Sequence, residues 1–380
     1  MLTKFSVKNF KNFKDEIIFD LSKSRDYKFN QECIKDGVIN KTIIYGKNAS
    51  GKTNLVLAIF DIISNLTDKI AIPHGNVDNP YIFYKNLGNI PSDSVDFNYE
   101  FILEGEKIKY SYRKMDKDIF TYEKLVINDV TIVELDRYHD KNQIRLNWNS
   151  LEDSGFDNSL KDDKLSAIKY IYKNSKVKDF NDSTSKTFIN FMSFIEKMLM
   201  FYSLEKRGFI GYETTSSKNV FKEIIARNKL QDFQSFLASF GLNYDLVETI
   251  DDFNTPTVAI RFGETKVLFH KICSSGTSAL ALFYFWYMDI EKIKLLVIDE
   301  FDAFYHYKLS SAIVKKLIDN DCQVILTTHN TSVMTNDLMR PDCYFRINQD
   351  GIISLADATS NEIRKVHNLE KIYRSGWFDE

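Results

Sequence analysis

The chain has 380 residues, of which 44% are apolar and 27% are charged, and its formal net charge is −3 at pH 7. This composition is typical of a globular protein that buries a sizeable core, and it excludes wholesale disorder, collagen and a coiled-coil rod. A protein that coats DNA would usually be basic, so a nucleic-acid site in this chain would have to be a local patch.

The 4 cysteines show no CxxC pairing, which argues against a disulfide framework or a zinc site and suits a reducing cytosol. The first residues lack the apolar segment of a signal peptide. The longest apolar stretch, residues 280–288, is about half a membrane span. We therefore expect a cytoplasmic protein that does not interact with a membrane.

The first part of the chain predicts strands and one helix. Short apolar or alternating runs predict strands at residues 5–10, 17–19 and 41–45, and a helical pattern follows from Gly51. Alternating runs on either side of Gly105 predict a hairpin of residues 95–101 and 108–112. Residues 119–147 are expected to add one or two strands.

The pattern changes after about residue 150. Apolar side chains recur at helical spacing between residues 188 and 195, and a helix pair is predicted at 217–241, without the sustained heptads of a long coiled coil. Strands and helices then alternate, with a strand from 256, a helix at 277–290, a strand at 294–298, a helix at 307–318 and a strand at 323–327. This alternation indicates a parallel sheet that is covered on both faces.

Residues 46–53 (GKNASGKT) fit the pattern G-x4-G-K-[ST] of a phosphate-binding loop. Glycines let the backbone turn its N–H groups toward phosphate oxygens, and the helix that follows adds its positive dipole end. Lys52 is expected to contact the β- and γ-phosphates and Thr53 to bind Mg²⁺. The other nucleotide contacts expected here are Gly46, Asn48, Ser50, Gly51 and Asn54. A plain glycine-rich turn is the alternative, but an apolar strand precedes the loop and an amphipathic helix follows it.

Residues 295–298 are apolar and lead into Asp299 and Glu300. Ligands of open α/β sheets bind at this end of parallel strands. We expect Asp299 to hold Mg²⁺, directly or through water, and Glu300 to orient and deprotonate an attacking water. Alone, the pattern also fits a strand that runs into a solvated turn; with the phosphate loop upstream it favours a nucleotide site.

Two weaker motifs lie on either side of this acidic strand. Ser274, Ser275 and Gly276 precede a helix and offer a second anion site, although such a turn alone is usually an N-cap. His329 follows the strand predicted at 323–327, 29 residues after Glu300. A histidine at a strand end is more often structural, but this one falls where a γ-phosphate sensor is expected.

In this order the four motifs resemble the ATP-binding-cassette ATPase superfamily, in the branch of the SMC, RecF and OLD proteins. The opening residues 5–13 (FSVKNFKNF) resemble the first strand of that branch. Residues 327–331 (TTHNT) and 338–342 (LMRPD) resemble prokaryotic AAA-family ATPases of abortive-infection and other anti-phage systems, such as the ATPase components of PARIS-, Septu- and AbiL-type modules.

The resemblance implies an α/β ATPase head with an inserted, mainly helical subdomain. Residues 1–150 would form the N-terminal lobe with an antiparallel β subdomain, 151–255 a helical insert or lid, and 256–380 the C-terminal lobe. It also implies a homodimer, or a higher homo-oligomer, in which each ATP lies between the phosphate loop of one chain and Ser274, Ser275 and Gly276 of the other. Asp302 resembles the aspartate of the D-loop at that interface.

Several features depart from the family pattern. The signature reads Ser-Ser-Gly-Thr instead of Leu-Ser-Gly-Gly, and residues 80–85 lack the expected Q-loop glutamine. Only 51 residues follow His329, too few for the Toprim domain of an OLD nuclease. The resemblance therefore favours an ATP-driven switch, with Mg²⁺ as its cofactor, that works with a separately encoded effector in phage defence.

Three other functions remain open. A RecF-like clamp would bind DNA, a transporter subunit would drive transport, and a scaffold would keep the fold without hydrolysis. Basic side chains cluster at 107–114, on either side of Tyr110 and Tyr112, and again at 164–178. These patches could contact nucleic acid; alternatively, the first is a strand with one buried and one solvated face.

Overall fold

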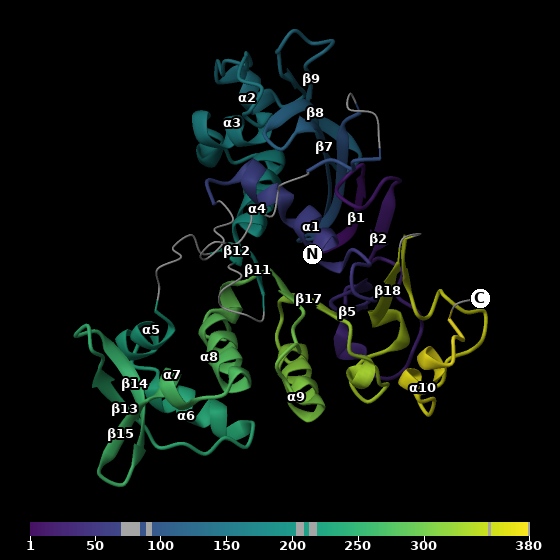
Figure 1. The fold of residues 1–380 in the computed structure, drawn as a ribbon. Helices are drawn as coiled ribbons and strands as arrows, with labels where there is room; N and C mark the ends of the chain where they lie inside the picture. The colour runs from purple at the N-terminus through teal and green to yellow at the C-terminus, as the bar shows by residue number, and fades with distance from the viewer. Residues whose placement is uncertain (70–83, 89–92, 203–208, 213–218, 349–350, 379–380) are drawn as a thin grey trace.

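The computed structural model describes residues 1–69, 84–88, 93–202, 209–212, 219–348 and 351–378 (Figure 1). Within these residues seven antiparallel strands form a β subdomain, the upper sheet in Figure 1. In spatial order its strands are β10 (Arg145–Leu146), β9 (Val130–Asp136), β8 (Ile119–Ile127), β7 (Glu106–Asp116), β6 (Val95–Leu103), β1 (Leu2–Lys8) and β2 (Ile17–Asp20). The predicted hairpin is β6 and β7, and β6 alternates buried and half-buried positions throughout.

A second sheet carries the predicted motifs. The described part of this sheet has, in spatial order, the strands β12 (Phe209–Gly211), β11 (Met198–Tyr202), β16 (Leu295–Asp299), β17 (Gln323–Thr328), β5 (Lys41–Tyr45), β18 (Tyr344–Asn348) and β19 (Gly351–Ser354). The five strands from β11 to β18 are parallel, and the two outer strands are antiparallel. Every residue of β5, β16 and β17 is buried, as expected for a parallel sheet covered on both faces.

Helix α1 (Lys52–Leu66) lies between the two sheets. It packs against β16 and β12 of the parallel sheet. On its other side, Tyr99 of β6 donates a hydrogen bond to the Ala58 carbonyl at 2.9 Å. Twelve of its fifteen residues are buried, because this helix has a protein neighbour on both sides. The phosphate loop is therefore attached to the β subdomain through the helix that follows it.

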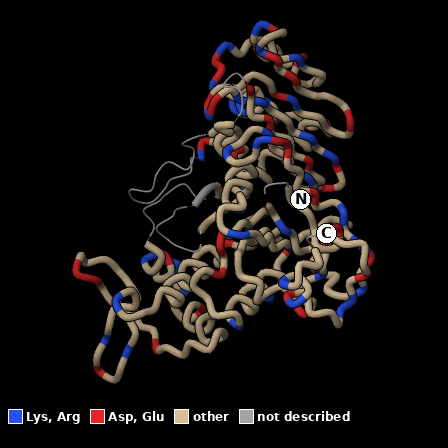
Figure 2. The backbone as a smooth tube through the Cα atoms, turned by 45° about the vertical axis from the view of Figure 1, so that its right-hand side comes forward, with Lys and Arg blue, Asp and Glu red and all other residues tan. Residues whose placement is uncertain are grey.

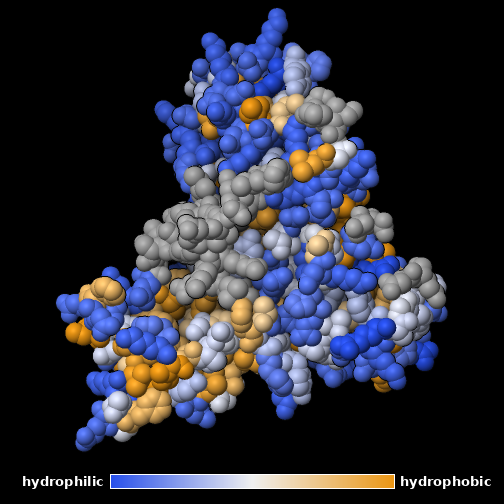
Figure 3. Space-filling view, in the orientation of Figure 1, coloured by the Kyte–Doolittle hydropathy of each residue, from blue (hydrophilic) through white to orange (hydrophobic). Residues whose placement is uncertain are grey.

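A third sheet extends from the lower left of the molecule (Figure 1). It consists of β13 (Leu246–Ile250), β14 (Pro256–Phe262) and β15 (Thr265–Leu268). Helices α5 (Val220–Ala226) and α6 (Leu230–Ser239) connect this sheet to α8 (Ser275–Tyr287). Apolar surface gathers here (Figure 3), and Phe253, in the turn after β13, is 89% exposed.

Two more strands and six more α-helices are described, together with short 3-10 helices. The strands and α-helices are β3 (Ile34–Lys35), β4 (Val38–Ile39), α2 (Asn149–Asp153), α3 (Ala167–Asn174), α4 (Ser183–Glu196), α7 (Phe269–Ile272), α9 (Tyr307–Ile318) and α10 (Leu369–Arg374). The predicted helix pair at 217–241 is α5 and α6, and the helix predicted at 307–318 is α9. Residues 151–255 do not form a separate helical body, since β11 from this segment pairs with β16 in the parallel sheet.

Candidate nucleotide-binding site

The loop of residues 46–51 joins β5 to α1 in a conformation that requires its glycines. Gly51 has φ +102°, in the left-handed region. A β-carbon at Gly46 would lie 2.3 Å from Ser50 Oγ and 2.9 Å from the Ile347 carbonyl oxygen, closer than atoms can approach. The loop is therefore compact, and only glycine fits at its first position.

Lys52 is the first residue of α1 and folds back over the loop. Its ammonium donates hydrogen bonds to the carbonyl oxygens of Gly46 at 2.8 Å and Lys47 at 3.2 Å. The side chain is buried, and burial lowers the pKa of the Lys52 ammonium. The Lys52 ammonium thus pairs with the loop carbonyls in this structure. A phosphate bound in the loop would give it a stronger, negatively charged partner.

Asn12 and Phe13, near the start of the chain, support this loop. A β-carbon at Gly51 would lie 2.6 Å from Asn12 Nδ2 and 2.8 Å from the Phe13 ring, so these two side chains press against the glycine. Asn54, on the first turn of α1, donates to Asn12 Oδ1 at 2.6 Å. No local pattern predicts this supporting role for residues 12 and 13, although they lie in the segment 5–13 that resembles the first strand of the family.

Asp299, the last residue of β16, is fully buried and bonded only to hydroxyl groups among the described side chains. Thr53 donates to its Oδ2 at 2.7 Å, and Thr327 donates to its Oδ1 at 2.5 Å. Burial raises the pKa of the Asp299 carboxyl, while the two hydroxyl bonds and Lys52 act in the opposite direction. The structure thus brings together the two residues that were predicted to bind Mg²⁺.

The two residues predicted to act on water and γ-phosphate lie at neighbouring strand ends. Glu300 is half-buried, has φ +49°, and its N–H donates to Thr327 Oγ1 at 2.9 Å. His329 is exposed just beyond β17, the strand beside β16. Parallel neighbouring strands end at the same edge of the sheet, and β5 leads into the phosphate loop from that edge.

Asp302 is buried and is held by a hydrogen bond from its own chain. Thr328 donates to Asp302 Oδ1 at 2.6 Å, and the other carboxylate oxygen has no hydrogen-bond partner among the described residues. Burial raises the pKa of the Asp302 carboxyl. The residue that resembles a D-loop aspartate therefore couples the loop after β16 to the end of β17.

The signature turn lies at the exposed start of α8. Ser274 caps this helix by accepting a hydrogen bond from the Thr277 N–H at 3.2 Å, and both Ser274 and Ser275 are exposed. A β-carbon at Gly276 would lie 2.8 Å from the Phe304 carbonyl oxygen. The turn thus packs on the loop that follows Asp302, and a larger residue at position 276 would displace that loop.

These residues fit a nucleotide with Mg²⁺. The compact glycine loop leaves no room for side chains at Gly46, and the helix behind it presents its N-terminal end. A threonine hydroxyl and a carboxylate are the oxygen ligands that Mg²⁺ takes beside substrate phosphates. Thr53 and Asp299 would hold the metal, which supplies charge stabilisation for the transferred phosphoryl group. Asn48 is exposed on the loop, so its predicted nucleotide contact is sterically open.

The basic cluster on β7 was predicted incorrectly in one respect. Lys114 is buried and bonds Asp61 of α1 at 2.9 Å, because the period of two places it on the same face as Tyr110 and Tyr112. Only the alternate positions, Lys109 among them, face solvent. Basic and acidic residues are interspersed over this subdomain (Figure 2), so β7 is a strand with one buried and one solvated face.

Two further expectations concern the middle of the chain. Lys169 and Lys173 of the second basic set both bond Asp68, at 2.9 and 2.7 Å. Of the region expected to hold a Q-loop glutamine, residues 80–83 lie outside the described residues. Tyr84 is described, and its hydroxyl donates to Asp61 Oδ1 at 2.9 Å.

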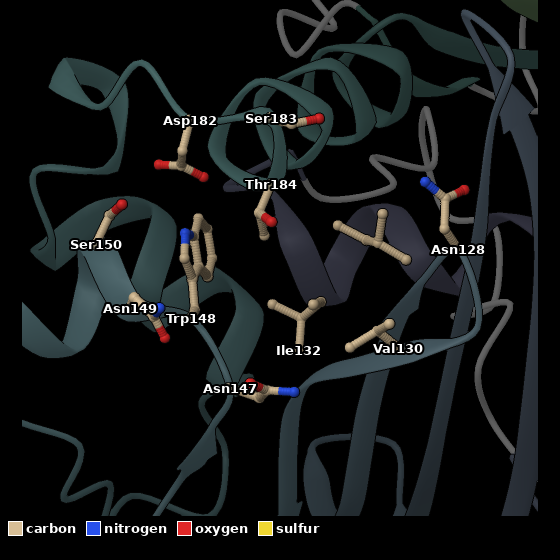
Figure 4. Close-up of a pocket in the computed structure, with 11 residues that line it drawn as sticks. Asn128, Val130, Ile132, Asn147, Trp148, Asn149, Ser150, Asp182, Ser183 and Thr184 are labelled. Carbon is tan, nitrogen blue, oxygen red and sulfur yellow. The ribbon is translucent and has the colours of Figure 1, made fainter.

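A separate pocket of about 490 Å³ lies between β9 and the start of α4 (Figure 4). Two of its lining residues bond Ser185 of α4: Asp182 accepts from the Ser185 N–H at 2.9 Å, and the Trp148 indole donates to Ser185 Oγ at 3.2 Å. None of residues 46–53 lines this pocket, so it is separate from the phosphate loop.

Solved head domains of SMC proteins are similar to this chain in structure. A solved SMC head domain from Thermotoga maritima is 14% identical, with a TM-score of 0.43 over 93% of this chain and 98% of that one. The SmcHead bound to the C-winged helix domain of ScpA is also 14% identical, with a TM-score of 0.47 over 94% and 98%. We draw no functional conclusion from these likenesses, and the search of curated proteins found no match.

Within the described residues, no helix combines the length and the apolar character needed to cross a membrane. The family comparison is more informative. Residues 41–335 match the model described as "AAA domain, putative AbiEii toxin, Type IV TA system". This range begins with β5 and includes the phosphate loop, the signature turn, the acidic strand and His329. Because the match spans well over half of the chain, this protein belongs to that family of AAA-domain ATPases.

Proposed function

We propose that this chain is a Mg²⁺-dependent ATPase whose nucleotide state controls the pairing of two copies. The observation that carries the proposal is the 2.7 Å hydrogen bond from Thr53 to Asp299, which joins the phosphate loop to the acidic strand across 246 residues of sequence. A hydroxyl and a buried carboxylate side by side at the start of a phosphate-binding helix have the composition of a magnesium–nucleotide site.

Each side chain has a distinct role in this proposal. Lys52 leaves the loop carbonyls to bind the β- and γ-phosphates and balances their charge. Glu300 accepts a proton from the attacking water, and its left-handed backbone directs it away from the strand. His329, exposed at the neighbouring strand end, senses the γ-phosphate. Asp299 does not compete as a base, because its two carboxylate oxygens are engaged by Thr53 and Thr327.

Pairing of two copies would complete the site. Ser274 and Ser275 are exposed at the N-terminus of a thirteen-residue helix, which suits them to a phosphate presented by a second chain. ATP then holds two chains together, and hydrolysis weakens the contact. The sequence resemblance supports a place in an anti-phage module, where the switch would act on a separately encoded effector.

Removal of the Lys52 ammonium tests nucleotide binding. We expect Lys52→Ala to lose ATP binding by more than about 10-fold, because the loss of a charge-assisted phosphate contact costs on the order of 2 kcal/mol. Lys107→Ala, an exposed lysine on β7, should bind ATP like the wild type. Calorimetric titration measures both, and an unchanged affinity of Lys52→Ala would refute the assignment of the loop.

The proposed switch is tested with Glu300→Gln. This variant should bind ATP but hydrolyse it slowly, and its native mass should double when ATP and Mg²⁺ are added. Wild-type turnover by Glu300→Gln would refute its role as base. A mass that ignores ATP would refute nucleotide-controlled pairing and leave the ATPase assignment standing.

A further inference from the structure

Thr327 makes three hydrogen bonds to three consecutive residues at the end of the neighbouring strand. Its hydroxyl donates to Asp299 Oδ1 at 2.5 Å and accepts from the Glu300 N–H at 2.9 Å. Its carbonyl oxygen accepts from the Phe301 N–H at 3.1 Å. The side chain is completely buried, so water does not replace these bonds.

The two hydrogen-bond partners of the Thr327 hydroxyl fix the orientation of its O–H bond. A carboxylate only accepts and a backbone N–H only donates, so the single proton of the hydroxyl must point at Asp299. Its lone pair is then free for the Glu300 N–H. Serine is the other aliphatic side chain that reproduces both bonds, whereas valine has the shape of threonine and reproduces neither.

Glu300 needs such a partner because its backbone is unusual. A φ of +49° lies in the left-handed region, where a residue with a β-carbon is disfavoured by about 1 kcal/mol or more. The bond to Thr327 satisfies the N–H of Glu300 in that conformation. The same hydroxyl occupies Oδ1 of Asp299, so that Oδ2 remains on the side of Thr53.

We propose that Thr327 is a positioning residue of the ATPase: one hydroxyl sets the carboxylate of Asp299 and the backbone of Glu300 together. This inference deepens the proposed function and depends on it. A residue of β17 would thus align the metal ligand and the base, although both of these lie at the end of β16. A change at the end of β17, next to His329, would therefore alter both groups at once.

The second threonine of the pair offers an internal contrast. Thr328 donates to Asp302 and accepts from the Asn330 N–H, at 2.6 and 2.9 Å. It makes the same kind of double bond but to the loop beyond the acidic strand. Thr328→Val should therefore affect pairing of the chains, whereas Thr327→Val should affect hydrolysis and its dependence on Mg²⁺.

The test compares Thr327→Val, Thr327→Ser and a matched control. Thr42 lies on β5, the next strand, and is buried with a hydroxyl that has no hydrogen-bond partner among the described residues. Thr42→Val makes the same chemical change in the same sheet without breaking a bond. Steady-state ATP hydrolysis is measured for the wild type and these three variants over a range of ATP and Mg²⁺ concentrations. Urea denaturation checks that each protein is folded.

We expect Thr327→Val to lower kcat by about 10- to 100-fold, as is usual when a residue that orients a metal ligand is removed. Its KM for ATP should change less than about threefold, because Lys52 and the glycine loop remain. The Mg²⁺ concentration for half-maximal rate should rise. Thr327→Ser should restore kcat to within about threefold of the wild type, and Thr42→Val should behave like the wild type.

Two results would overturn the inference while the ATPase assignment stands. The first is hydrolysis by Thr327→Val at the rate of Thr42→Val. The second is an equally inactive Thr327→Ser, because serine keeps the hydroxyl and its failure would show that the two hydroxyl bonds do not account for the activity. If Thr327→Val does not fold, Thr327→Ala removes the same hydroxyl without added bulk. Absence of hydrolysis by the wild type would instead refute the proposed function, and this inference with it.

Discussion

Two buried carboxylates, one on α1 and one beside its first turn, differ in their partners. Asp61, in the middle of α1, is 1% exposed and bonds the equally buried ammonium of Lys114 at 2.9 Å. Asp299, beside the first turn of α1, is fully buried and bonds the hydroxyls of Thr53 and Thr327. Among the described residues, the first carboxylate has an ion-pair partner, whereas the second accepts its side-chain hydrogen bonds only from hydroxyl groups.

The partners of Asp61 indicate a structural role for this carboxylate. Tyr84 and Tyr112 each donate to Asp61 at 2.9 Å, so that its ion pair joins α1, β7 and the segment at 84–88 into one network. A buried ion pair with further hydrogen bonds fixes a geometry. A buried carboxylate whose donors among the described side chains are all hydroxyl groups suits a cation from outside, and Asp299 stands next to a phosphate loop.

The largest effect is expected from removing the counter-ion of Asp61. Lys114→Met should lower the free energy of unfolding by about 3–5 kcal/mol, because it leaves a buried carboxylate without a cation. Urea denaturation measures this change. Lys109→Met, on the solvated face of the same strand, should cost less than about 1 kcal/mol. Similar values for the two variants would contradict a structural role for the Asp61 pair.

Asp299→Asn should have the opposite effect on stability and a severe effect on activity. The metal-free variant should be at least as stable as the wild type, because burial disfavours the charged form that it removes. Hydrolysis should fall by more than about 100-fold, since a bound metal contributes several kcal/mol to the transition state. A destabilised, active variant would place Asp299 with Asp61 as a structural residue.

A smaller change is expected at Tyr84. Tyr84→Phe removes one of the donors to Asp61 but leaves Lys114 in place. We expect a loss of about 1.5–3 kcal/mol in the free energy of unfolding, the usual range for a hydrogen bond to a charged group. Tyr122→Phe, which loses a bond to the half-buried Glu134, is the surface control and should cost less. Equal losses would show that the Asp61 network is no tighter than a surface contact.

The subtlest effect is a pH dependence. Burial raises the pKa of Asp299 above the ordinary carboxyl value, so the folded chain holds this proton more tightly than the unfolded chain does. Stability of the metal-free wild type, relative to Asp299→Asn, should therefore fall as pH rises from the ordinary carboxyl pKa through the raised one. Paired unfolding curves between about pH 4 and 7 measure this, and a gap that does not change with pH would contradict it.

Sequence patterns predicted the local parts of this site well. The loop at 46–53, the helix after it and the acidic strand at 295–299 each depend on residues that are contiguous in sequence. The two residues expected to bind Mg²⁺ meet in the structure. Lys114 was misassigned although the period of two, followed one step beyond Tyr112, would have placed it in the core.

Other features depend on long-range contacts that no local pattern encodes. Strand β11 lies within a segment expected to be helical, and only its pairing with β16 makes it part of the parallel sheet. Asn12 supports a glycine that is 39 residues away in sequence. The sequence predicts a strand at 323–327, but the partners of Thr327 and Thr328 depend on the packing of that strand beside β16.

The most direct test of the contrast between Asp61 and Asp299 is the affinity for ATP with and without Mg²⁺. Calorimetric titration would be made on the wild type and on Asp299→Asn. We predict that Mg²⁺ tightens ATP binding by the wild type at least about 10-fold, the equivalent of 1.4 kcal/mol, and leaves the variant almost unchanged. An equal effect of Mg²⁺ on both proteins would mean that Asp299 does not hold the metal and that its burial beside the phosphate loop is only structural.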